Sequence, residues 1–463
     1  MASDPRLQAL RGVSRRSFLR WSTALGVALG LERAAVLNVI SDTAGTALAD
    51  KAACASTLRS LHFIGGNGGH AWFQLLFPHH DIAKNGGPNI PFHARGKTTT
   101  AAGTDRPLVY APESPFQKRG PTRQITAFMA GTAENHTNAP TAAATIAQGT
   151  SMIASIAAIQ SANPSLIPVV AVNPFQYGTA VGAPQVNVVN KSGLADLFDS
   201  TASKTLLQTP DAADLHDSYY RAFQNLNAAS GRRTLKNPND AGKLASSLLG
   251  RSLGDRLRVT PADEARYGIQ GAPTNVADIA RILISSAKAF GLGLTSSVIL
   301  PAMSDDPHQA FANVGNIAQT QANVARLGKI LDCFMSDCDS IQDPSGCGRP
   351  LSDSLMMTFH GDTPKNPLVA NAWPDNTPGN SNWVYVYGCG YLKTGWFGGI
   401  SASGAISGFN PATGADVPNQ SSAATTNAAA AAAAYAAARG DMRRVQDFYR
   451  GGPIDGIVRA LQM

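Results

Sequence analysis

The chain has 463 residues, of which 15% are charged, and it is rich in Gly (44) and Pro (28). Its formal net charge is +7, but six Arg against two Asp and one Glu in residues 1–49 supply +3 of that total, which leaves about +4 for residues 50–463. No block of Lys and Arg interleaved with aromatic residues remains there, which argues against a nucleic-acid-binding protein. The length after position 49 is enough for one large domain.

The first distinctive pattern is the segment SRRSFLR at residues 14–20, which runs directly into an apolar stretch at 21–31. This pattern is typical of a twin-arginine signal, which the twin-arginine translocation machinery reads. The apolar stretch is too short for a stable membrane span, which needs about 20 residues. We therefore predict a signal peptide over 1–49, cleaved after Ala49, and a mature protein at 50–463 that is exported to the periplasm or the cell exterior.

Six short apolar runs of the mature chain have the length of β-strands, and each ends at Gly or at polar residues. The runs are Leu61–Ile64, Ile125–Met129, Ile167–Val172, Ser297–Leu300, Leu355–Phe359 and Trp383–Tyr387. Stretches with helical periodicity lie between them, and this alternation predicts an α/β fold with a mainly parallel sheet sandwiched by helices. Ligands in such folds bind at the carboxyl ends of the strands, so the polar residues there are candidate site residues.

Three other segments are predicted to be helical. Apolar residues at spacings of three, four and seven predict one long helix over Pro307–Phe334. Residues 197–265 are polar and lack strand-like runs, and we expect them to form an inserted helical cap over one end of the sheet. The alanine-rich run Ala428–Ala438 has a high intrinsic helix propensity. A low-complexity linker is the alternative that the sequence leaves open for this run.

The best-defined candidate site follows the apolar run Ser297–Leu300. Asp305 and His308 stand at a predicted strand-to-helix junction, where a carboxylate and an imidazole can bind one metal ion such as zinc. Asp306 has another interpretation, since Pro307 suits a first helical position and Asp306 suits the N-cap before it. We therefore take Asp305 and His308 as metal-ligand candidates and assign Asp306 to the cap.

Two further polar clusters follow predicted strands. His360 and Asp362, after the fifth run, offer a second imidazole and carboxylate for the same metal. The alternative is a loop in which Asp362 only satisfies the backbone before Pro364. His136 and Thr137 follow the second run and precede a helix-like stretch, where a hydroxyl beside a histidine can become an attacking nucleophile. The alternative role of Thr137 is to cap that helix.

Five cysteines lie after position 49, namely Cys54, Cys333, Cys338, Cys347 and Cys389. The turn signal DPSG between Cys338 and Cys347 predicts a disulfide between these two in an oxidising compartment. A zinc knuckle that adds Cys333 to the pair is the alternative, although the spacing fits no common C-x-x-C pattern.

Two motifs near the start of the mature chain are interpreted as structural. The glycine-rich segment at 65–70 lacks the spacing of a dinucleotide-binding loop and the G-K-[ST] of a phosphate-binding loop, so it does not predict nucleotide binding. The cluster His79-His80-Asp81 is interpreted as part of a surface loop.

Several of these features together resemble an exported bacterial family known as domain of unknown function 1501. They include the twin-arginine signal, the Gly-Gly turn after the first predicted strand and the Asp and His cluster at 305–308. The run TFHGDTP at 358–364 is similar to the family's S-E-F-G-R-T-P, with Phe359 and Asp362 in place of its acid and its Arg. The segment GCGYLKTGWFGG at 388–399 is similar to its G-x-G-x-x-x-G-G-x-x-G motif.

That family resembles the alkaline phosphatase and sulfatase superfamily, whose members use divalent metals at strand ends to hydrolyse phosphate or sulfate esters. The resemblance implies an alkaline-phosphatase-like fold and places Asp305, His308 and His360 near a divalent metal. It also implies a small anionic ester as substrate, attacked by Thr137 or by a water that the metal activates. Because Asn67 stands where the superfamily often has a metal-binding Asp, we expect at most one well-held metal. The alternative is a non-catalytic exported binding or surface-associated protein on the same fold.

Overall fold

The computed structural model describes residues 56–65, 71–85, 98–130, 144–163, 165–173, 177–198, 253–303, 313–344, 348–361, 382–401, 403–418 and 423–460, together with Ser218 and Arg221. The predicted signal peptide and its cleavage site lie outside these residues. The chain divides into two compact units. One comprises Met1–Gly45 and Ala195–Arg258, and the other comprises Thr46–Leu194 and Val259–Met463.

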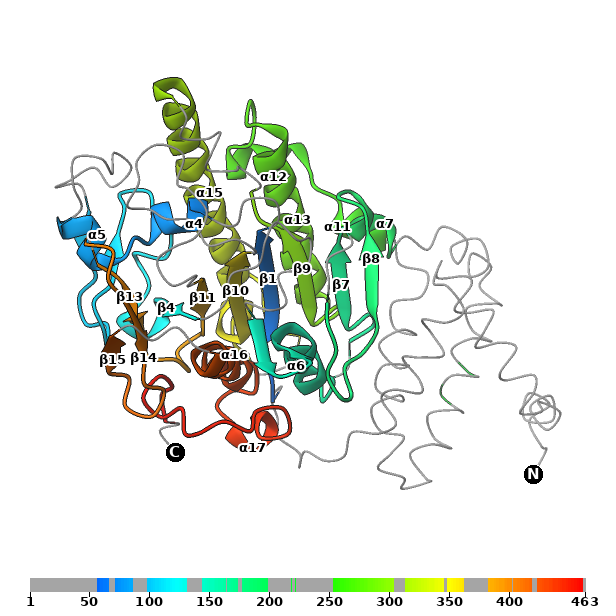
Figure 1. Ribbon diagram of the computed structural model, residues 1–463. Helices are drawn as coiled ribbons and strands as arrows, with labels where there is room; N and C mark the ends of the chain where they lie inside the picture. Colours follow the sequence, from blue (N-terminus) through cyan, green and yellow to red (C-terminus); the bar gives the residue numbers. More distant parts are fainter. Residues whose placement is uncertain are drawn as a thin grey trace, which may run out of the picture. The chain divides into compact units, whose positions relative to one another are not determined.

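The first unit contributes few described residues, among them α11 (Leu253–Leu257). The helical cap predicted for 197–265 overlaps this unit, but it also includes α12 (Pro261–Tyr267), which belongs to the second unit. Most of 197–265 lies outside the described residues, so the cap stays a prediction. The sheets and the longer helices belong to the second unit (Figure 1).

An eight-stranded sheet lies at the centre of the second unit, with the strand order β12-β4-β11-β10-β1-β9-β7-β8. Its strands are β1 (Arg59–Gly65), β4 (Ile125–Met129), β7 (Val169–Val172), β8 (Val186–Val189), β9 (Ser297–Pro301), β10 (Leu355–Gly361), β11 (Trp383–Tyr387) and β12 (Gly395–Phe397). Neighbours are parallel except where β11 pairs with β10 and with β4. The predicted α/β class with a mainly parallel sheet is confirmed, and all six predicted strands are in this sheet.

The direction of β11 corrects one expectation from the sequence. Its register pairs Trp383 with Met129 of β4 and Val384 with His360 of β10, both antiparallel. The strand therefore begins at the edge where its neighbours end, and Gly388 follows it at the opposite edge. The residues of an apolar run do not reveal the direction in which its strand will pair, because that depends on the connections and the partners.

Smaller sheets accompany the central one in the described part of the chain. They are formed by β13 (Gly399–Ile400), β14 (Ile406–Phe409) and β15 (Asp416–Pro418), by β2 (Thr99–Thr100) and β3 (Val109–Tyr110), and by β5 (Thr145–Ala147) and β6 (Thr150–Ser151). The first of these continues from β12, with Gly398 between the two strands, so it lies beside the β12 edge of the central sheet (Figure 1).

Helices cover both faces of the central sheet (Figure 1). They are α4 (Ala71–Leu76), α5 (His80–Asn85), α6 (Met152–Gln160), α12, α13 (Thr274–Gly291), α15 (Val314–Ser340), α16 (Ala423–Ala437) and α17 (Met442–Val445). On one face, Gln160 of α6 bonds to Ser60 of β1, and α6 packs against α16. On the other, Phe73 of α4 stacks on Phe359 of β10 with 3.9 Å between ring centroids. On that second side α4 packs against α15, and α15 packs against α12 and α13.

The helix predicted for Pro307–Phe334 is present as α15, but this helix begins at Val314 and ends at Ser340. Its N-cap is Asn313, whose side chain accepts a hydrogen bond of 3.0 Å from the backbone N–H of Asn316. Asp306, to which the sequence assigned the cap, lies outside the described residues. Within the part of the chain that the structure covers, no helix combines the length and the apolar character needed for a membrane crossing.

The alanine-rich run forms α16, so the linker alternative is wrong. Every alanine from Ala428 to Ala438 is at most 2% exposed. Alanine has the highest helix propensity, and its small side chain lets a helix approach its neighbours closely. The helix is accordingly buried against α6 and β5, and the carbonyl of Ala437 accepts a hydrogen bond from the N–H of Leu58 at the start of β1.

Candidate functional site

All strands of the central sheet except β11 end at its carboxyl edge, among them β9, β1, β10 and β4. β9, β1 and β10 are adjacent and parallel, and β4, which lies beyond β11, runs in the same direction. The chain therefore leaves all four strands at one edge, as the sequence analysis expected for the segments that follow them. This is the edge at which α/β sheets bind ligands.

Most of the predicted site residues lie outside the described residues. Asp305 and His308 follow β9, His136 and Thr137 follow β4, and Asp362 follows β10 directly. The strand order brings the starts of these three segments to the same edge. The convergence of Asp305, His308 and Asp362 with His360 on one metal, and of His136 and Thr137 as the catalytic residues beside it, stays a prediction.

Of the predicted metal ligands, His360 is the one that the structure describes. It lies in β10 directly before Gly361, the last residue of that strand. His360 is 1% exposed, and neither Nδ1 nor Nε2 has a hydrogen-bond partner among the described residues. Burial lowers the pKa of His360 to about 4, so the ring is neutral at pH 7. An unpartnered buried ring is costly, but a neutral imidazole with free nitrogens suits a metal ligand.

His62 lies on the same face of the sheet, in the neighbouring strand β1. Its Nδ1 is 2.7 Å from the hydroxyl of Thr358, and its Nε2 is 2.9 Å from the hydroxyl of Ser60. The pKa of His62 is lowered to about 3, mainly by burial and to a smaller extent by the nearby His360. Because both nitrogens have partners, we interpret this neutral ring as a structural link between β1 and β10.

The partners of Ser60 continue this buried polar network. The side-chain amide of Gln160 donates to the carbonyl of Leu58 at 2.7 Å and to the hydroxyl of Ser60 at 3.1 Å. The hydroxyl of Ser297 in β9 is 3.0 Å from that of Ser60. Four elements are thus joined by polar side chains inside the core.

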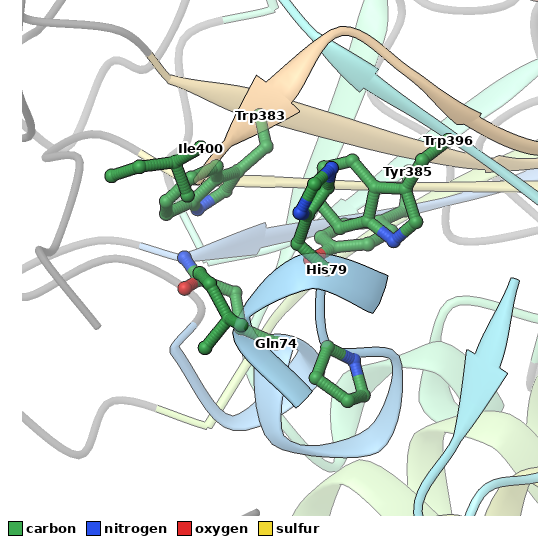
Figure 2. Close-up of a pocket in the computed structure, with 8 residues that line it drawn as sticks. Gln74, His79, Trp383, Tyr385, Trp396 and Ile400 are labelled. Atoms are coloured by element: carbon green, nitrogen blue, oxygen red, sulfur yellow. The ribbon is translucent and has the colours of Figure 1, made fainter. Parts of the chain in front are cut away.

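A second cluster, the aromatic hollow, lies on the opposite face of the sheet, where α4, the start of α5 and the strands β11 to β13 meet. It is lined by Gln74, Pro78, His79, Ile82, Trp383, Tyr385, Trp396 and Ile400 (Figure 2). The empty volume is about 210 Å³ and includes space open to solvent. The space enclosed among the side chains is about 10 Å³, which is room for about one water molecule.

His79 is buried in the wall of the hollow, so its interpretation as a surface-loop residue was wrong. It is 9% exposed, and its ring packs edge-to-face with Trp396 at 5.0 Å between centroids. The pKa of His79 is lowered to about 3, mainly by burial and to a smaller extent by the adjacent His80. The ring is therefore neutral. The backbone N–H of Asp81 donates to Nδ1 at 3.3 Å. The proton of the neutral ring is therefore on Nε2.

The glycine-rich motif at 388–399 forms part of the same wall. Gly395 has a φ of 107°, which favours glycine, and it lies against the backbone of Arg106, where a Cβ would clash. Gly399 lies against Nε2 of His79, where a Cβ would overlap the ring. These close approaches let β12 and β13 bring Trp396 and Ile400 into the hollow.

The described cysteines form no disulfide with one another. Cys333, Cys338 and Cys389 are free thiols, and burial raises the pKa of Cys338 in α15. Cys347 lies outside the described residues, so the predicted bridge between it and Cys338 is not shown and stays a prediction. The described residues include no group of three or more His, Cys, Asp or Glu that could hold a metal ion.

Comparison with known proteins gives no match. No protein-family model matches this chain, and neither a curated protein nor a solved structure does. The resemblance to the exported bacterial family therefore stays an expectation from the sequence.

Sequence reasoning missed several residues that the structure brings together. The most detectable was His62, because a histidine inside the apolar run Leu61–Ile64 must find partners in a core. Gln74 and Trp396 gave no comparable signal. Their place in the hollow depends on the packing of α4 against β11 and β12, segments about 300 residues apart in the sequence.

Proposed function

We propose that the protein is an exported, metal-assisted hydrolase of phosphate or sulfate esters, with its site at the carboxyl edge of the central sheet. The observation that carries the proposal is His360, a buried neutral imidazole next to that edge with no partner for either nitrogen among the described residues. Leaving such a ring unpaired costs free energy. A ligand that binds one of its nitrogens would recover that cost.

His360, Asp305, His308 and Asp362 would hold one divalent ion, with zinc as the first candidate, since imidazole and carboxylate groups are its usual ligands. When bound, the metal supplies positive charge that polarises the ester and stabilises the charge developing on it. Because the pKa of His360 is about 4, its lone pair is available for coordination across the neutral pH range.

His136 and Thr137 would provide the attacking group. They follow β4, which ends at the same edge as β10 and β9. In this role the hydroxyl of Thr137 would attack the phosphorus or sulfur of the ester while His136 accepts its proton as a general base. The bond to the ester alcohol would break, His136 would return the proton to that alcohol, and water would then hydrolyse the ester formed on Thr137. A small anionic ester fits a site with these groups, and an alkaline-phosphatase-like arrangement of the sheet is part of the same proposal.

The proposal is tested by metal content and hydrolysis measured together. The mature protein is purified from the periplasm, its metal is measured by elemental analysis, and p-nitrophenyl phosphate and p-nitrophenyl sulfate are used as substrates. We expect about one bound metal per chain and hydrolysis of at least one ester. His360→Ala should lose both, whereas His79→Gln, which changes an equally neutral buried histidine on the other face, should keep both.

A wild-type protein that binds neither zinc nor manganese after incubation with an excess of each, and that hydrolyses neither ester, would contradict the proposal. The non-catalytic binding protein would then be the better interpretation. Metal and activity that survive in His360→Ala would instead remove His360 from the site.

A further inference from the structure

Trp72 is a second buried polar side chain beside the carboxyl end of β10. It lies in the first turn of α4, the helix that follows the end of β1 along the chain. Its indole packs edge-to-face with the ring of Phe359, at 6.3 Å between centroids. Phe359 is two residues before Gly361, the last residue of β10. The indole of Trp72 is therefore next to the edge at which the candidate site is expected.

The indole nitrogen of Trp72 has no hydrogen-bond partner in the described part of the chain. Trp72 is 3% exposed, and its Nε1 is a fully buried atom. His360 has the same two properties, and it directly follows Phe359 in β10. Because consecutive residues of a strand face opposite sides of the sheet, Trp72 and His360 lie on the two sides of one strand end. Buried polar groups are normally bonded, so this pair indicates a ligand at the end of β10.

The chemistry of the two groups assigns them to different parts of such a ligand. An indole N–H is a donor only, and tryptophan is not among the usual metal ligands. Its partner must be an acceptor, such as an oxygen of a phosphate or sulfate group. That oxygen carries negative charge, which makes the bond shorter and stronger than one between neutral groups. The neutral imidazole of His360 has instead a lone pair that suits a metal ion.

We propose that Trp72 is a substrate-binding residue, whose indole N–H donates to a non-bridging oxygen of the phosphate or sulfate group. The inference rests on the proposed hydrolase and adds a group that holds the anionic part of its substrate. The same oxygen is present in the ester and in the inorganic anion that hydrolysis releases. Loss of the N–H should therefore weaken the binding of both, and the metal should stay in place.

Trp72→Phe is the test, because it keeps an aromatic ring against Phe359 and removes the N–H. The mature protein is titrated with inorganic phosphate and inorganic sulfate by calorimetry, and KM is measured with the two p-nitrophenyl esters. The variant should raise the Kd of at least one anion, and the KM of the matching ester, by about tenfold. Its metal content should equal that of the wild type.

Trp396→Phe is the matched control. Trp396 is 2% exposed and its Nε1 also has no partner among the described residues, but it lies in β12, three strands away from β10. Its replacement should change neither Kd nor KM. Circular dichroism of both variants confirms that they fold. Equal effects of the two replacements would overturn the inference, since the change would then not be specific to the end of β10.

A second readout needs no folded variant of Trp72. In wild-type protein with isotope-labelled tryptophan, phosphate or sulfate should shift the indole N–H resonance of Trp72, which is assigned by replacing the other tryptophans one at a time. An indole resonance that neither anion shifts at about 10 mM, or an unchanged Kd and KM in Trp72→Phe, overturns the inference even if the wild type hydrolyses an ester. Anion binding through Trp72 without metal or hydrolysis would instead refute the hydrolase and keep Trp72 as an anion-binding residue.

Discussion

Nδ1 of His62 and the hydroxyl of Thr358 are 2.7 Å apart, at directly paired positions of the two central strands β1 and β10. Both residues are fully buried, so water does not compete for this bond. Nε2 of His62 contacts the hydroxyl of Ser60, which accepts a hydrogen bond from Gln160 of α6. The polar contacts of His62 thus extend to a neighbouring helix. A polar link at this place fixes which residues of β1 and β10 lie opposite each other, because any shift would leave a buried imidazole unpaired.

Replacing Thr358 tests the energetic role of this link. Thr358→Val keeps the shape and removes the hydroxyl, so Nδ1 of His62 loses its partner inside the core. We expect the free energy of unfolding to fall by about 1–3 kcal/mol, measured by urea denaturation. Thr358→Ser keeps the hydroxyl and should cost less than the Val variant. A Val variant as stable as the wild type would show that the bond contributes nothing.

The burial of His79 predicts acid sensitivity. Its pKa in the folded protein is about 3, lowered first by burial and then by His80, while Asp81 opposes the shift and Arg106 adds to it. In the unfolded chain the ring takes up a proton below about pH 6.5. The unfolded state then binds more protons, so this stabilisation is complete above pH 6.5 and is lost as the pH falls towards 3.

At pH 5 the protonation of His79 in the unfolded chain should lower the free energy of unfolding by on the order of 2 kcal/mol. Urea unfolding at several pH values between 7.5 and 5 measures it. In His79→Gln, which has no titratable ring, the decline of stability over this window should be shallower than in the wild type. Identical slopes for the two proteins would contradict the assignment of a neutral buried ring.

The tight burial of α16 predicts that larger side chains will not fit. Ala432 is 0% exposed at the middle of the helix. Ala432→Leu should lower the free energy of unfolding by about 1–3 kcal/mol, because a well-packed core has no room for the added atoms. Ala265→Leu, at an exposed position of α12, is the control and should change stability by less than about 0.5 kcal/mol. Thermal unfolding of both variants gives the comparison, and equal effects would refute close packing around α16.

Export is predicted to depend on the arginine pair of the signal. The receptor distinguishes guanidinium from ammonium groups, since arginine presents a planar set of donors that lysine lacks. The double replacement of Arg15→Lys and Arg16→Lys should leave the precursor in the cytoplasm. Fractionation followed by immunoblotting measures this, and a normal amount of exported protein from the double variant would disprove the dependence.

The strands were predictable because their signal is local. Runs such as Ile125–Met129 and Trp383–Tyr387 are apolar, rich in β-branched or aromatic residues and bounded by Gly or polar residues. A buried strand in a sheet covered on both faces requires that pattern. The α16 helix followed from alanine propensity in the same way. Chain order and the strand-end residues also predicted the edge of the sheet for the candidate site, and His360 lies next to that edge.

The tertiary structure decided what depends on pairing between distant segments. The reversed direction of β11, the bond between His62 and Thr358, and the burial of His79 against Gly399 each join residues that are far apart in the chain. Composition and periodicity describe one segment at a time, so they indicate that a residue is apolar or able to bind a ligand. Which partner it meets is set by the packing of whole elements, and that packing separates a structural histidine such as His62 from an unpartnered one such as His360.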